Sequence, residues 1–192
     1  MTARPVTATD GERAASAAAE RVEIVDVTGA VERIVERAVM RRDRLRHRCT
    51  YIVVVDPDDR LAVHRRAAWK DVWPSRWDLA FGGVVGVGED WADAAARELA
   101  EEAGIVVPAS SLTELGRGDY DDADVSVLGR VYLARSNGPF TFPDGEVAED
   151  DRVPLADLAT WLIGRAICPD SVALAGAPLG NLAAMRRNSD LT

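Results

Sequence analysis

Cysteine, histidine and lysine are scarce in this chain of 192 residues. The two cysteines, Cys49 and Cys168, are too few and too far apart to predict a disulfide framework or a zinc site. The two histidines, His47 and His64, cannot build a multi-histidine metal centre, and Lys70 is the only lysine. These absences exclude disulfide-stabilised and histidine-based metal proteins, and they leave arginine as nearly the whole positive charge.

Long apolar runs and an excess of positive charge are also missing. No stretch of 18 or more apolar residues exists, and we expect neither a membrane span nor a secretory signal. Arg and Lys together number 23 against 32 Asp and Glu, which gives a formal charge of −9. Such a chain lacks the cations that a general nucleic-acid binder uses against phosphates, although a few local cations could hold a small phosphorylated ligand. We therefore expect a cytoplasmic protein with no membrane and no nucleic-acid partner.

The length predicts one domain, and the apolar content of 47% is enough for a core. Residues 1–21 are small, polar and rich in alanine, so we expect a disordered or loosely helical tail. The expected domain covers residues 22–185, and residues 186–192 are expected to fray. No internal repeat or interior linker divides it.

Periodicity predicts alternating strands and helices. Residues 49–55 are β-branched and continuous, and residues 60–65 alternate after an Asp- and Pro-containing turn, which predicts a hairpin. Residues 90–103 are the clearest helix, with an apolar stripe and a glycine after the last turn. Other strands are expected at 22–27, 79–85, 112–116, 125–134 and 139–142, and other helices at 31–46, 154–167 and from 169 onward with a break near 176–180.

Three glutamates share one face of the helix predicted at 90–103. Glu98, Glu101 and Glu102 stand at i, i+3 and i+4, where like charges repel each other. Either water solvates this face, or a cation neutralises it. A preceding loop rich in glycine and the adjacent Arg97 favour the cation, and oxygen ligands suit a hard ion such as Mg²⁺ or Mn²⁺.

The segment from residue 83 to residue 105 also matches a long motif, G-x5-E-x7-R-E-U-x-E-E-x-G-U, in which U is aliphatic. Every position fits, with the fixed letters at Gly83, Glu89, Arg97, Glu98, Glu101, Glu102 and Gly104 and the aliphatic ones at Leu99 and Ile105. This segment resembles the Nudix box, and so many letters at fixed spacing make a specific signal.

The resemblance implies an α/β protein with the Nudix fold, a mixed sheet sandwiched between helices. It implies a metal-dependent hydrolase that cleaves pyrophosphate linkages, and it allows a homodimer. The implied Mg²⁺ or Mn²⁺ ligands are Glu98, Glu101, Glu102 and the carbonyl of Gly83. Glu98 or Glu101 would assist the attacking water as the catalytic residue, and Glu89 and Arg97 would tie the loop to the helix.

Residues upstream of the box resemble the isopentenyl-diphosphate isomerase branch of the same superfamily. Arg66 and Lys70 fall where that isomerase binds a diphosphate, so they are candidate substrate-binding residues. The catalytic cysteine and the metal-binding histidine of the isomerase are missing from residues 80–85, and its later glutamates are missing from residues 125–128. These departures favour hydrolysis over isomerisation.

The leading interpretation is a Mg²⁺-dependent hydrolase of a small metabolite, either of the nucleoside-diphosphate type or another diphosphate. One alternative is a regulatory module that binds a nucleotide, and a less favoured one is a prenyl-diphosphate isomerase. The general base also stays open: Glu146 or Glu149, in an acidic loop, could serve in place of a box glutamate, or that loop could simply be solvated.

Overall fold

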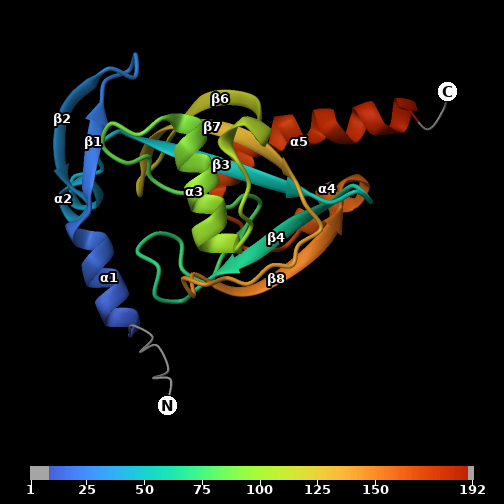
Figure 1. The fold of residues 1–192 in the computed structure, drawn as a ribbon, viewed down its shortest axis with the longest axis horizontal. Coiled ribbons are helices and arrows are strands. Elements are labelled where there is room, and N and C mark those ends of the chain that lie inside the picture. The colour runs from blue at the N-terminus through green and yellow to red at the C-terminus, as the bar shows by residue number, and fades with distance from the viewer. Residues whose placement is uncertain (1–8, 190–192) are drawn as a thin grey trace.

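The computed structural model describes residues 9–189 and is built around one mixed sheet of eight strands (Figure 1). The strands are β1 (Arg21–Val25), β2 (Val31–Glu36), β3 (His47–Val55), β4 (Arg60–Arg66), β5 (Trp77–Asp78), β6 (Thr113–Asp121), β7 (Ser126–Arg135) and β8 (Val147–Pro154). The helices are α1 (Asp10–Ala19), α2 (Arg37–Arg42), α3 (Trp91–Ala103), α4 (Leu158–Leu162) and α5 (Pro169–Ser189), with short 3-10 turns at Ala109–Ser111 and Leu155–Asp157.

Strand β3 is the centre of the sheet. It pairs in parallel with β7 along its whole length and antiparallel with β4 only at its last residues, Val54 and Val55. Strand β4 instead pairs with β8, so β3 and β4 diverge away from their hairpin. Residues 81–84 lie beside β3 where it has separated from β4: Phe81 forms a bridge with Ile52, and Val84 forms one with Cys49. The sheet therefore opens where the glycine-containing loop lies.

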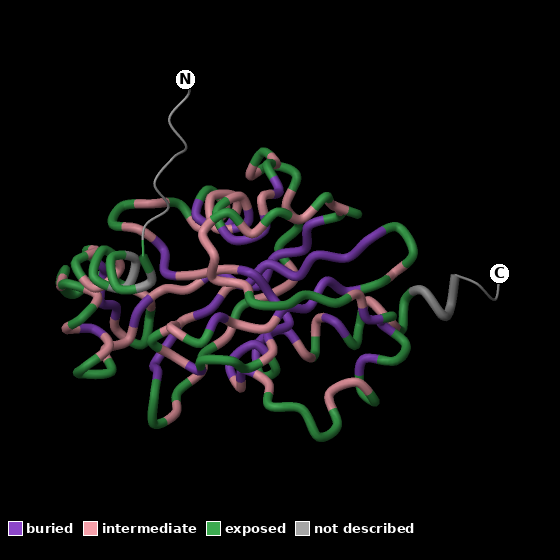
Figure 2. The backbone as a smooth tube through the Cα atoms, turned by 90° about the horizontal axis from the view of Figure 1, so that it is seen from below, coloured by how far each residue is buried: buried purple, intermediate pink, exposed green. Residues whose placement is uncertain are grey.

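Helices cover both faces of β3 because its side chains alternate. Ile52 and Val54 pack in a cluster with Leu99 of α3, whereas Val53 and Val55 pack in a second cluster with residues of α5 such as Leu174. Figure 1 shows α3 in front of the sheet, and Figure 2 shows buried backbone concentrated in the central strands. The predicted α/β fold class, a mixed sheet between helices, is confirmed.

Helix α3 follows the sequence prediction closely. The side chain of Asp90 caps its start by accepting from the amide of Ala92 at 2.9 Å, and Gly104 ends it in the left-handed conformation. Ala95, Leu99 and Ala103 are fully buried along one stripe. This packing fixes the direction of the opposite, acidic face.

The segment before residue 45 differs from the prediction. The helix expected at 31–46 is wrong in its first half, since residues 31–36 form β2, which pairs with β1 as a hairpin. Only the six residues of α2 are helical. Glu23 of β1 accepts hydrogen bonds from the amide of Gly88 at 2.9 Å and from Arg48 at 2.6 Å, so this hairpin holds the glycine-containing loop.

Other differences lie at the edges of the sheet. The strands expected at 79–85 and 139–142 are absent apart from the isolated bridges of 81 and 84, while the unpredicted β8 pairs with β4. The helix expected at 154–167 is reduced to a 3-10 turn and α4, and α5 runs unbroken through 176–180 to Ser189. The tail predicted at 1–21 includes α1 and the first residue of β1, and its residues 1–8, like the C-terminal residues 190–192, lie outside the described part. No described helix is long and apolar enough to cross a membrane.

Candidate functional site

A loop at residues 82–90 brings the backbone against α3. The backbone of Gly82 has φ of +142°, and a Cβ there would lie 2.1 Å from the carbonyl oxygen of Thr50. Its amide donates to Oε2 of Glu102 at 2.8 Å. Only glycine permits this approach, and the bond holds the Glu102 carboxylate at the opening of the sheet.

The next glycine makes room for a second carboxylate. A Cβ at Gly83 would lie 2.6 Å from Oε2 of Glu98, so the Glu98 carboxylate packs directly on the backbone there. The Gly83 carbonyl, predicted as a metal ligand, accepts from the amide of Thr50 at 2.9 Å. The Thr50 hydroxyl donates to the same oxygen at 3.5 Å, so a cation bound to this carbonyl would replace that longer bond.

Arg97 connects the loop with the acidic face. Its Nε and Nη2 donate to the two oxygens of Glu89, both at 2.9 Å, and Glu89 in turn accepts from the amide of Gly86 at 2.7 Å. Nη1 donates to Glu98 at 2.7 Å and to Glu101 at 3.1 Å. One guanidinium thus joins three carboxylates of the loop and the helix.

Burial disfavours the charged form of two of the glutamates. It raises the pKa of Glu98 to about 7 despite the neighbouring Arg97, and it raises the pKa of Glu102 well above its usual value despite Lys70. The Glu101 side chain is 56% exposed at the rim. The three glutamates therefore do not share a solvated face: Glu98 and Glu102 are desolvated, whereas Glu101 lies at the rim.

A second group of carboxylates faces the helix from the loop before β8. Oxygens of Glu102, Asp144 and Glu146 lie within 4.8 Å of one another. Burial raises the pKa of Asp144 to about 6, whereas Lys70, which pairs with Glu146, lowers the pKa of Glu146 in spite of burial. The sequence analysis did not single out Asp144, although the acidic composition of its loop was a signal.

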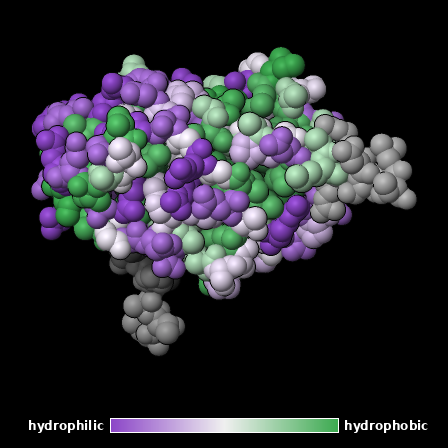
Figure 3. All heavy atoms as spheres, turned by 90° about the horizontal axis from the view of Figure 1, so that it is seen from above, coloured by the Kyte–Doolittle hydropathy of each residue, from purple (hydrophilic) through white to green (hydrophobic). Residues whose placement is uncertain are grey.

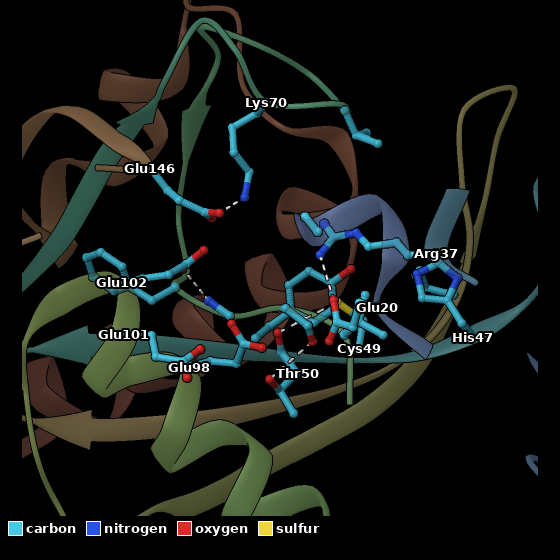
Figure 4. A pocket seen from close by; sticks show the side chains of 18 of the residues that line it. Glu20, Arg37, His47, Cys49, Thr50, Lys70, Glu98, Glu101, Glu102 and Glu146 are labelled. Carbon is cyan, nitrogen blue, oxygen red and sulfur yellow. Dashed lines mark hydrogen bonds and ion pairs between the residues drawn. The ribbon is translucent and has the colours of Figure 1, made fainter. Parts of the chain in front are cut away.

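These side chains line one cavity of about 940 Å³ at the opening of the sheet (Figure 4). All four predicted ligand residues border it, as do Arg66, Lys70, Glu89 and Arg97. Arg66 lies 3.7 Å from Asp78, and Lys70 reaches Glu146. Glu149 is not a lining residue, because its side chain pairs with Arg65 on the outer surface at 2.9 Å.

The inner wall of the cavity contains residues that sequence reasoning did not assign to the site. The hydroxyl of Tyr51 donates to Asp170 at 2.7 Å, and burial together with nearby Asp78 raises the pKa of Asp170 to about 7. Cys49 is beside them, and burial raises the pKa of its thiol to about 12, so it stays protonated. These residues come from β3, β5 and α5, which only the folded sheet brings together.

The remaining wall comes from the N-terminal segment. Glu20, at the end of α1, accepts from Arg37 of α2 at 3.2 Å, and both residues line the cavity across from the glutamates of α3 (Figure 4). Figure 3 shows hydrophilic residues gathered at the end of the molecule that carries this segment. The site is therefore bounded by the glutamates of α3 on one side and by the Glu20–Arg37 ion pair on the other.

Comparisons with known proteins agree with this geometry. The model of the NUDIX domain matches residues 45–167. An uncharacterized Nudix hydrolase of Yersinia pestis is 39% identical over 139 residues, covering 72% of this chain and 75% of its own, and one of Streptomyces coelicolor is 39% identical over 158 residues, covering 78% and 84%. A crystal structure from Deinococcus radiodurans has a similar fold, with a TM-score of 0.67, 23% identity and coverage of 88% and 98%. The chain belongs to the Nudix hydrolase family and is a pyrophosphohydrolase.

Proposed function

We propose that the protein hydrolyses a pyrophosphate linkage in a small diphosphate metabolite and that it requires Mg²⁺ or Mn²⁺. The observation that carries this proposal is a pair of carboxylates that line a large cavity, the buried Glu102 and the half-buried Glu98, whose charged forms desolvation disfavours. A divalent cation bound between them would stabilise the charged form of both carboxylates.

The donor set fits such a cation. Glu98, Glu101, Glu102 and the carbonyl of Gly83 offer only oxygen, which hard divalent ions prefer. Asp144 and Glu146 add two oxygens close to Glu102, so they are candidates for a further ligand or for the base. When bound, the cation supplies charge that stabilises the developing negative charge on the phosphate oxygens and acidifies a bound water.

The residues of the chain position the reactants and move the proton. Arg97 fixes the orientation of the Glu98 carboxylate through its hydrogen bond of 2.7 Å. Glu98 or Glu101 accepts the proton of the attacking water. Arg66, which donates to the carbonyl oxygen of Val72 and lies 3.7 Å from Asp78, and Lys70, which pairs with Glu146, bind the diphosphate oxygens.

The test is a substrate panel assayed with Mg²⁺ and with EDTA. The panel contains nucleotide sugars, dinucleotides, ADP-ribose and prenyl diphosphates; a Nudix domain of Shewanella oneidensis with 17% identity has been crystallised with ADP-ribose. We expect metal-dependent release from at least one class. Replacing a residue that only hydrogen-bonds to a metal ligand typically lowers metal affinity or activity roughly 10–100-fold. Glu102→Gln replaces a proposed ligand itself, so it should lower metal-dependent hydrolysis at least about 100-fold.

Glu114→Gln is the matched control, because Glu114 lies on β6 and pairs only with Arg130 among the described residues. It should retain wild-type activity. Mn²⁺ binding followed by electron paramagnetic resonance should weaken in Glu102→Gln and not in Glu114→Gln. Equal activity and equal Mn²⁺ binding in the two variants, or no metal-dependent release from any compound, would overturn the proposal.

A further inference from the structure

A side pocket opens beside the main cavity, between α1, α2 and the loop after β4. Its volume is about 150 Å³, and it shares Arg37, Arg41, Trp69, Lys70 and Glu146 with the lining of the main cavity. At about 30 Å³ per water molecule, the space corresponds to roughly five waters. A ligand in the main cavity can therefore extend one compact group into it.

Besides Arg97, four described Arg or Lys side chains line the main cavity. Three of these four also line the side pocket. Arg37 and Arg41 lie one turn apart on the same face of α2, and Lys70 faces them from the loop. The carboxylates that line it are Asp71 and Glu146, and Glu20 pairs with Arg37 from the side of the main cavity at 3.2 Å. The side pocket therefore brings three cations together in a protein whose net charge is −9.

The two arginines keep donors unused. Nε of Arg41 donates to Asp71 at 3.1 Å, Nη2 of Arg37 lies 3.6 Å from the same oxygen, and Nη1 of Arg37 donates to Glu20 at 3.2 Å. Nε of Arg37 is buried and has no hydrogen-bond partner among the described residues. Because a buried donor without a partner is costly, an anion bound here would satisfy it.

The positive charges of Arg37 and Arg41 lower the pKa of two neighbouring side chains. Burial and then Arg41 and Arg37 lower the pKa of His47 to about 3. The pKa of Asp71 falls to about 2, because Arg41 and Arg37 outweigh its burial. Asp71 therefore stays ionised and orients the two guanidinium groups, and His47 stays neutral, with Nδ1 placed 2.9 Å from the carbonyl oxygen of Leu45.

We propose that this side pocket binds a phosphate monoester of the substrate, in addition to the diphosphate that is cleaved. The proposal rests on the proposed function and defines its substrate class as a diphosphate compound that carries a further phosphate. A phosphate accepts bidentate hydrogen bonds from arginine and carries up to two charges, which matches two guanidinium groups and a lysine. Lys70 lines both pockets and pairs with Glu146, which belongs to the carboxylate group of Glu102 and Asp144. The side pocket would therefore hold the additional phosphate while the diphosphate lies in the main cavity.

The NUDIX match begins at residue 45, so α1 and α2 lie before it and the family match does not assign Arg37 or Arg41. The structure thus separates two tasks. The matched part supplies the glutamates and the chemistry, whereas the preceding segment supplies the group that selects the substrate.

Paired compounds that differ by one phosphate test the inference. NADPH and NADH form one pair, and coenzyme A and dephospho-coenzyme A form the other. Binding is measured by calorimetry in EDTA, so the readout does not depend on hydrolysis. We expect the wild-type protein to bind the phosphorylated member of at least one pair roughly ten- to a hundredfold more tightly, as for hydrogen bonds to a charged group.

Ala38 offers the sharpest variants, since it lines the side pocket on an exposed face of α2. Ala38→Glu adds a carboxylate and should abolish the preference, whereas Ala38→Gln has the same size without the charge and should keep most of it. Arg41→Gln should also abolish the preference. Arg42→Gln should not, because Arg42 is 70% exposed and pairs with Asp43.

Each outcome bears on the inference separately from the proposed function. Equal binding of both members of each pair by the wild-type protein would overturn it, as would a preference that survives in both Ala38→Glu and Arg41→Gln. A phosphate preference that follows these variants would support it even if the panel with Mg²⁺ showed no hydrolysis. Hydrolysis of the panel without any phosphate preference would leave the proposed function standing and remove this inference.

Discussion

Replacing Arg97 with methionine should destabilise the protein by an amount that the structure allows us to work out. Its guanidinium makes two hydrogen bonds to Glu89 and one to Glu98, whose side chains are 21% and 13% exposed. A hydrogen bond to a charged group contributes roughly 1.5–3 kcal/mol, but exposed ion pairs contribute only about 0–1 kcal/mol. Since Arg97 itself is 34% exposed, we discount the sum strongly and expect a loss of about 2–3 kcal/mol.

Urea unfolding of the metal-free protein measures this loss directly. For a chain of this size, about 2–3 kcal/mol corresponds to a decrease of roughly 4–12 °C in the midpoint of thermal unfolding. Arg97→Lys keeps the charge but cannot bind both oxygens of Glu89, so it should lose about half as much. Arg42→Met, at an exposed position, should stay within about 0.5 kcal/mol of the wild-type protein.

Two results would refute the reasoning. If Arg97→Met were as stable as Arg42→Met, the hydrogen bonds of Arg97 would contribute nothing to the folded state. If Arg97→Lys were fully stable, the charge would matter and the bidentate contact with Glu89 would not.

Three further predictions test other parts of the fold. Gly83→Ala should displace the Glu98 carboxylate, because a Cβ would lie 2.6 Å from its oxygen, and should lower metal-dependent hydrolysis at least about tenfold with little change in thermal stability. Burial and nearby Asp78 raise the pKa of Asp170 from 3.8 to about 7, so protonation of Asp170 stabilises the folded state. The free energy of unfolding should therefore fall as the pH rises from about 4 to 7, and Asp170→Asn should flatten that dependence; an unchanged slope in thermal scans would contradict the cause. Leu99→Ala should cost about 2–5 kcal/mol in urea unfolding, since Leu99 is fully buried under the sheet, and a loss below 1 kcal/mol would contradict this packing.

The sequence predicts the parts of the fold whose pattern is local. The continuous β-branched run of β3 and the capped, amphipathic α3 are confirmed because burial and helix period are visible in the residues themselves. Strand β8 was missed, since its exposed residues are mostly charged and only its pairing with β4 defines it. The helix expected at 31–46 failed for a related reason: its valines and isoleucine also suit a strand, and pairing with β1 decides between the two.

The site divides in the same way. Spacing along one helix predicts Glu98, Glu101 and Glu102, the resemblance to the Nudix box adds Gly83, and the structure brings all four to one cavity. Asp144 and Arg37 could not be found in that manner, because they reach the cavity from a loop and a helix far away in sequence. The cytoplasmic location, the homodimer, the absence of a nucleic-acid partner and the likeness to the isomerase branch stay predictions.

The two hydrogen bonds of Glu23 have a practical consequence for chimeric proteins. Gly88, in the loop that precedes α3, and Arg48, on β3, both depend on this one carboxylate. A sequence exchange between relatives that joined two parents at residue 45, where the NUDIX match begins, would combine a hairpin from one parent with a loop from the other. Crossovers placed before Arg21 keep the carboxylate and its two donors in one parent, so libraries designed in that way should yield more folded and active members.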